Sequence, residues 1–138
     1  MAGNIHLEIV TPEKTVVSED VQIVMAPGTL GEFGVLIGHT PFMSTLNLGT
    51  VHYKDPEGKE RFVFISGGFA EALPDQVTIL AESAERRADI DLGRAKSALS
   101  RAQERLAMED DRDIDYERAR SAMQRALHRI KIAESRRT

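Results

Sequence analysis

The chain has 138 residues, of which 41% are hydrophobic and 29% charged, a composition typical of one folded domain or of a small domain with an appendage. No stretch approaches the roughly 18 apolar residues of a helix that spans a membrane. We expect no secretory signal at the start. The absence of cysteine excludes disulfides and zinc–thiolate sites. The net charge of −4 argues against a dedicated nucleic-acid binder, which is usually basic.

Turn-forming residues and charge both divide the chain into two unlike halves. All five prolines precede residue 75, and nine of the ten glycines lie at or before Gly68. Residues 1–85 hold four basic and twelve acidic residues, whereas residues 86–138 hold fourteen basic and ten acidic ones. This division predicts a folded acidic body followed by a basic interaction arm.

The first half is predicted to consist of about ten short strands. The run Phe62–Ile65 is suited to a strand that is buried on both faces. Asp55–Gly58 predicts a hairpin turn, because proline presets φ and glycine accepts a positive φ. Other strands are indicated by alternating apolar residues at Ile5, Leu7, Ile9, Val21, Ile23, Met25, Val77 and Ile79. Short strands that recur about every 8–12 residues favour a β-sandwich or barrel over a βαβ fold.

The second half is predicted to form two antiparallel helices joined by the charged turn Glu109–Asp113. Asp91 is the candidate N-cap of the first helix, and Asp113 or Asp115 of the second, since a carboxylate accepts from the free amides of a first turn. The apolar stripes are Leu92, Ala95, Leu99, Ala102 and Leu106, then Ala119, Ala122, Met123, Ala126, Leu127, Ile130 and Ala133. Because alanine buries little area, we expect a weak interface that can open.

No pattern in the chain predicts catalysis or metal binding. The glycines between Gly28 and Gly38 are not followed by the Gly-Lys-Ser/Thr of a phosphate loop, and Ser66–Gly68 lacks the first glycine and the helix of a nucleophile elbow. The four histidines have no metal-ligand spacing, and His39 is interpreted as bonding the backbone of a tight loop or contacting a partner. We therefore expect neither an active site nor a metal site.

Three arginines in the helical half are candidates for anion binding. Arg125 and Arg129 are four residues apart and share a helix face, and an antiparallel hairpin brings the first turn with Arg94 close to them. A polyphosphate would relieve the repulsion among the three guanidinium groups. Glu85 and Asp91 could accept from a ribose or base. The alternative is that these arginines are solvated and that Asp91 is only a helix cap.

In order and spacing, the whole chain resembles the ε subunit of bacterial F-type ATP synthase. The matching stretches are Val10–Pro12, Gly31–Leu36, Gly38–Pro41, Ser66–Phe69, Val77–Ala81, Ala84–Arg86, Asp89–Ala95 and the arginine-rich second helix. The resemblance implies an α+β chain with an N-terminal β-sandwich at 1–86 and a C-terminal antiparallel two-helix hairpin at 87–138.

The resemblance also implies a role and partners. The chain would be a non-catalytic rotor subunit of the central stalk, on the cytoplasmic face of the bacterial inner membrane without inserting into it, coupling proton-driven rotation to ATP synthesis. Its sandwich would bind the γ subunit and the c-ring, and no nucleic acid. The residues that match the family's contact loops are Glu32, Gly38, His39, Thr40, Pro41 and Phe42.

The hairpin is implied to be a regulatory arm. In its extended form it would contact the α and β subunits and block ATP hydrolysis, and ATP would stabilise its compact form as a regulatory ligand rather than a required cofactor. The residues that match the family's ATP-binding pattern are Glu85, Ile90, Asp91, Arg94, Ala95, Arg125 and Arg129. The alternative function is a stand-alone adaptor whose basic hairpin docks acidic proteins or nucleic acid.

Overall fold

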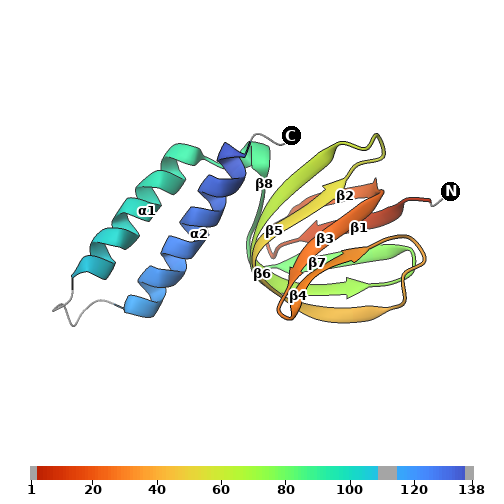
Figure 1. The fold of residues 1–138 in the computed structure, drawn as a ribbon, viewed down its shortest axis with the longest axis horizontal. Helices are drawn as coiled ribbons and strands as arrows, with labels where there is room; N and C mark the ends of the chain where they lie inside the picture. The colour runs from red at the N-terminus through yellow and green to blue at the C-terminus, as the bar shows by residue number, and fades with distance from the viewer. Residues whose placement is uncertain (1–2, 109–114, 136–138) are drawn as a thin grey trace.

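The computed structural model describes residues 3–108 and 115–135, and it places eight strands beside two helices (Figure 1). We call the strand-rich part, residues 5–86, the body, and the two helices the arm. In chain order the strands are β1 (Ile5–Val10), β2 (Thr15–Val21), β3 (Ile23–Gly28), β4 (Gly31–Val35), β5 (Phe42–Lys54), β6 (Glu60–Ala72), β7 (Gln76–Ala81) and β8 (Ala84–Arg86). A short 3₁₀ turn, η1 (Arg87–Asp89), leads to α1 (Leu92–Ala107) and α2 (Tyr116–Glu134).

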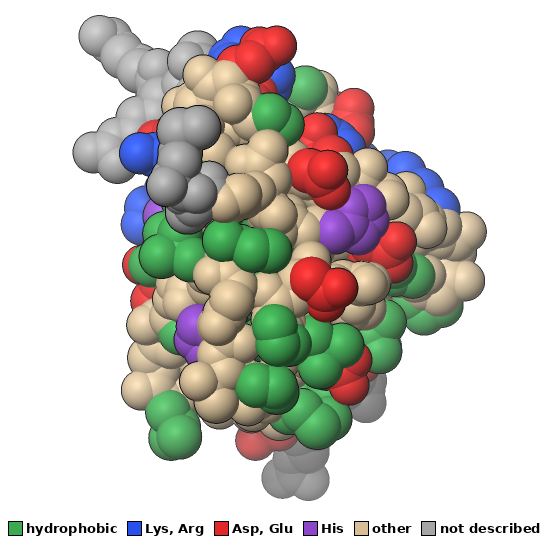
Figure 2. All heavy atoms as spheres, turned by 90° about the vertical axis from the view of Figure 1, so that its right-hand side faces the viewer, with side chains coloured by type: hydrophobic (Ala, Val, Ile, Leu, Met, Phe, Trp, Pro, Cys, Tyr) green, Lys and Arg blue, Asp and Glu red, His purple; other side chains and the backbone are tan. Residues whose placement is uncertain are grey.

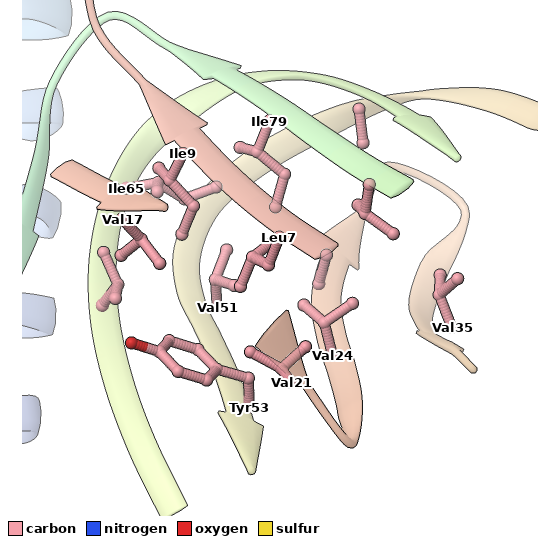
Figure 3. Packing of buried hydrophobic residues seen from close by; sticks show 14 of the residues in the cluster. Leu7, Ile9, Val17, Val21, Val24, Val35, Val51, Tyr53, Ile65 and Ile79 are labelled. Carbon is pink, nitrogen blue, oxygen red and sulfur yellow. The ribbon is translucent and has the colours of Figure 1, made fainter. Parts of the chain in front are cut away.

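The strands follow the order β2-β1-β7-β6-β5-β3-β4, and β8 pairs with β6. All neighbours are antiparallel except β1 and β7, which are parallel. The sheet curls around one apolar core (Figure 3). The predicted fold class, a sandwich of strands followed by a two-helix hairpin, is confirmed.

The described residues contain eight strands rather than about ten, and β5 and β6 are 13 residues long rather than short. Glycines that indicate turns in the sequence lie inside these continuous strands. Gly68 has a positive φ of 151°, and a Cβ there would lie 2.1 Å from the carbonyl oxygen of Leu80 on the neighbouring strand. Glycine thus permits a bend and a close strand approach inside β6 without ending the strand.

The core is almost entirely aliphatic, with Tyr53 as its aromatic member. The fully buried side chains include Ile5. Figure 3 shows six others, Leu7, Ile9, Val17, Val51, Ile65 and Ile79. The alternation predicted through Val21, Ile23 and Met25 is wrong beyond Val21, because the chain turns at Gln22 and the buried residues of β3 are Val24 and Ala26. A change of one residue in phase moves every side chain of a strand to the other face.

The arm is a helical hairpin with the predicted caps. The carboxylate of Asp91 accepts from the amide of Arg94 at 3.0 Å, and that of Asp115 accepts from Arg118 at the same distance. The start of α1 lies beside the end of α2, where Lys96 pairs with Glu134 at 3.5 Å. Buried alanines line the seam (Ala95, Ala102, Ala119 and Ala126), whereas Leu127 of the predicted stripe is exposed. The predicted turn Glu109–Asp113, with the alternative cap Asp113, lies outside the described residues.

Candidate functional site

The contact between the arm and the body is made chiefly by α2, which lies between α1 and the strands (Figure 1). On β6, Val63 and Ile65 belong to the core of the body, whereas Phe64 is fully buried without belonging to that cluster. Alternating residues of a strand point to opposite faces, and the guanidinium of Arg129 lies 4.5 Å from the centre of the Phe64 ring. Phe64 is therefore covered by the arm, which explains why this strand is buried on both faces.

An ion pair crosses the same junction. Arg129 of α2 donates from Nε and from Nη2 to Oε1 of Glu85 on β8, with both distances 2.9 Å. The side chains are 25% and 31% exposed, so the pair is shielded from bulk water only in part. Arg129 thus joins the arm to the body through one carboxylate and one aromatic ring. Two of the predicted ligand-binding residues therefore contact each other directly, although they are 44 positions apart in the sequence.

The other predicted ligand-binding residues lie around this junction. Asp91 is bound to the first turn of α1, where Arg94 is exposed. Ala95 is buried in the seam between the helices. Arg125 is half-buried and lies one turn before Arg129 on α2. Ile90 lines a cavity of about 500 Å³ that the linker and the end of α2 form against β5 and β6.

The 500 Å³ cavity is lined by three arginines and by one buried tyrosine. Arg61, Arg86 and Arg87 line it together with Tyr53. The Nε of Arg61 donates to Asp55 at 3.3 Å and that of Arg86 donates to the carbonyl of Val16 at 2.9 Å, so both have partners. Burial, followed by the neighbouring Glu19, raises the pKa of Tyr53 well above its ordinary value. The phenol is therefore neutral at any physiological pH.

A larger cavity, of about 770 Å³, lies between α2 and the strands. From α2 its walls include His128, Lys131 and Ile132, and from the body they include Glu32, His52, Glu60 and Phe62. Nε2 of His52 lies 3.3 Å from the carboxylate of Glu32. The Nδ1 atom of His128 is buried without a hydrogen-bond partner among the described residues. The sequence pattern did not single out His128, because nothing in its neighbours indicates that it faces the body.

The predicted contact loop of the body is a small aromatic cluster. Gly38 adopts a positive φ of 81°, its amide donates to the carbonyl of Pro74 at 2.6 Å, and the ring of His39 bonds the carbonyl of Thr40. Phe42 packs against His39 and, edge to face, against Phe33, with ring centres 4.9 and 5.0 Å apart. Pro41 and Thr40 are exposed, whereas Glu32 faces His52 on β5.

Large apolar side chains are exposed on the body. Met43 is 62% and Leu80 is 52% exposed, and Leu36 is exposed beside the loop at 38–42. Figure 2 shows hydrophobic side chains gathered on the face turned away from the arm, with acidic side chains among them. Gathered apolar surface of this kind marks protein contacts. In the described part of the chain, no helix has the length and hydrophobicity to span a bilayer, and no three acidic or histidine side chains are placed to hold a metal ion.

Comparison with known proteins gives matches along both parts of the chain. Residues 4–87 match the family described as the β-sandwich domain of the ATP synthase delta/epsilon chain, and residues 88–134 match its long α-helix domain. The chain is 67% identical to the ATP synthase epsilon chain of Desulfatibacillum aliphaticivorans over 111 residues, which are 80% of this chain and 79% of that one. It is 64% identical to the epsilon chain of Desulfosudis oleivorans over 106 residues, 77% of this chain and 80% of that one.

A solved structure shows the same fold at larger evolutionary distance. A chain in the cryo-EM structure of the Euglena gracilis mitochondrial ATP synthase, which contains OSCP, F1 and the c-ring, is similar with a TM-score of 0.75 and 25% identity. The match covers 90% of this chain and 78% of that one.

Proposed function

The chain belongs to the delta/epsilon family of ATP synthase subunits, and we propose that it couples rotation of the c-ring to ATP synthesis through its body and regulates ATP hydrolysis through its arm. It is a stalk subunit of the ATP synthase rotor, without an active site of its own. The observation that carries the regulatory proposal is the junction between body and arm, which consists of a partly exposed ion pair and one phenylalanine covered by the arm.

The body is proposed to bind the γ subunit and the c-ring. Exposed Met43, Leu80 and Leu36 supply apolar contact area, and the loop at 38–42 lies beside Leu36 and Met43 in the chain. The acidic charge of residues 1–85 suits basic loops on the c subunits. We place the subunit, with the complex, on the cytoplasmic face of the bacterial inner membrane.

The arm is proposed to inhibit ATP hydrolysis when it leaves the body and extends into the catalytic head. The arm contacts the body chiefly where α2 meets β5 and β6, and the ion pair of Arg129 with Glu85 is partly exposed, so separation should cost little free energy. The test is reconstitution of the full complex with the whole chain or with a chain that lacks residues 88–138, followed by measurement of ATP hydrolysis. Faster hydrolysis with the truncated chain supports the proposal, whereas equal rates would leave the body's role intact and remove the arm's.

ATP is proposed to stabilise the compact arm by binding around Arg94, Arg125 and Arg129. Because Arg129 already bonds Glu85, a phosphate oxygen would compete with or share that carboxylate contact. A ligand that prefers the compact form tenfold shifts the equilibrium by about 1.4 kcal/mol. Calorimetry should show weaker ATP binding for Arg125→Ala and Asp91→Ala. Asp115→Ala is the matched control, because it removes the cap of α2 and leaves the proposed site intact.

A further inference from the structure

His128 lies on α2 at the contact between the arm and the body. It projects from α2 into the 770 Å³ cavity, next to the buried Ile132 on the helix and opposite Phe62 of β6. Its Nδ1 is buried without a hydrogen-bond partner among the described residues. A neutral imidazole can leave one nitrogen unprotonated in such a place, whereas an imidazolium ion needs acceptors for two N–H groups and carries a charge.

The charged neighbours of His128 do not favour its protonation. Burial lowers the pKa of His128 from the ordinary 6.5, and the positive charge of Lys131 on the same helix lowers it further. Across the cavity, Glu32 of β4 is bonded to His52 of β5, and Glu60 projects from β6. These carboxylates do not offset the burial and the lysine.

We propose that His128 is an acid-sensitive latch: a second proton on its imidazole loosens α2 from the body and shifts the arm toward its separated form. The proposal rests on the proposed function of the arm, since it assumes that the arm can separate. The latch responds to protons from the solvent, and protonation weakens the contact of α2 with β5 and β6. The consequence is an arm that becomes available for inhibition when the surrounding solution turns acidic.

The direction of the effect follows from linkage. The docked imidazole has the lower pKa, so the neutral form contributes its full stabilisation of docking above pH 6.5. Docking weakens as the pH falls below 6.5, because the separated form binds the proton and the docked form does not. The ratio of separated to docked arm should rise about tenfold between pH 7.5 and 5.5 while the docked imidazole stays neutral.

The test is single-molecule energy transfer on the full chain. The chain has no cysteine, so Lys14→Cys in the body and Ser100→Cys on α1, both exposed, accept the two dyes. The separated fraction is measured from pH 7.5 to 5.5, with circular dichroism to confirm that the body stays folded. Measurements are repeated with Glu85→Gln, which removes the Arg129 ion pair and raises the separated fraction.

Three variants decide the outcome. His128→Gln and His128→Met should abolish the tenfold rise, and His52→Gln, in the same cavity, should retain it. A flat response of the unmodified chain, or a rise that survives in both His128 variants, would overturn the proposal. If the arm separates in the Glu85→Gln chain to the same extent at every pH, the proposal for His128 is wrong, but the proposed function of the arm stands. If it separates under no condition, the regulatory function fails with it.

Discussion

The body and the arm bury their apolar residues in different ways. The body encloses large branched side chains, such as Leu7, Ile9 and Ile79, from which all water is excluded (Figure 3). The seam of the arm consists of alanines, which remove much less area from water for each residue. The body is therefore held together by its own core, whereas the place of the arm is decided by a few contacts with β5, β6 and β8.

The largest effect should come from a cavity in the body. Ile79→Ala should lower the free energy of unfolding of the body by about 2–5 kcal/mol, because surrounding strands cannot collapse into the space. The half-buried Ile130→Ala on α2 is the matched change in the arm and should cost the body nothing measurable. Urea denaturation followed by far-ultraviolet circular dichroism measures both. Similar losses in the two variants would show that body and arm unfold as one unit.

A smaller effect is expected at the junction. Arg129→Gln removes the ion pair with Glu85 and the contact with Phe64, which we expect to weaken docking by about 1 kcal/mol, since both side chains are partly exposed. Hydrogen exchange on α2 should become about fivefold faster while the amides of β1 and β7 keep their protection. Unchanged exchange on α2 would mean that other contacts hold the arm.

Glycine-to-alanine substitution should act with opposite signs in the two regions. Gly93 lies in the first turn of α1, where an added Cβ meets only the Asp91 carboxylate at 3.6 Å, so Gly93→Ala should stabilise α1 by up to about 1 kcal/mol. Gly68→Ala should destabilise the body, because its Cβ would overlap the Leu80 carbonyl. The melting temperatures of the two variants are measured by circular dichroism, with the helix signal and the strand signal followed separately. A Gly68→Ala chain as stable as the unmodified one would contradict the strained strand approach.

The smallest expected effect is that of mild acid on the stability of the body. The backbone amides of Lys59 and Glu57, with Arg61, hold the pKa of Asp55 below 3.8 in the hairpin turn of the body. The stabilisation by this carboxylate is complete above pH 3.8 and is lost as the pH falls through its lowered value. Titration of Asp55 should thus leave the melting temperature of the body unchanged from pH 7.5 to 5 and lower it below pH 4. A fall near pH 6 would assign acid sensitivity to the body instead of the arm.

Local patterns predicted much of the fold. The alternation in β1 and β7, the turn at Asp55–Gly58 and the caps at Asp91 and Asp115 depend on residues close in sequence, and all are as expected. The errors arose where tertiary packing overrides local signals. Short strands were expected where β5 and β6 each run through 13 residues, and the turn at Gln22 changed the phase of β3.

The candidate site was predictable only in part. The sequence indicated that Arg129 shares a face with Arg125 and that the run containing Phe64 is buried on both sides. It did not indicate that Glu85 would be the partner of Arg129, or that His128 would face a cavity with Glu60 and His52. Those pairings join positions tens of residues apart, so no short-range pattern encodes them.

The sequence alone therefore determined the division into an acidic strand-rich body and a basic hairpin, since turn residues, helix caps and apolar periods act within a few residues of each other. Only the tertiary structure decided which face of α2 meets the body and which polar groups lose their water there. Burial and ion pairing depend on everything that surrounds a group, and for Arg129 and His128 those surroundings come from strands distant in the chain.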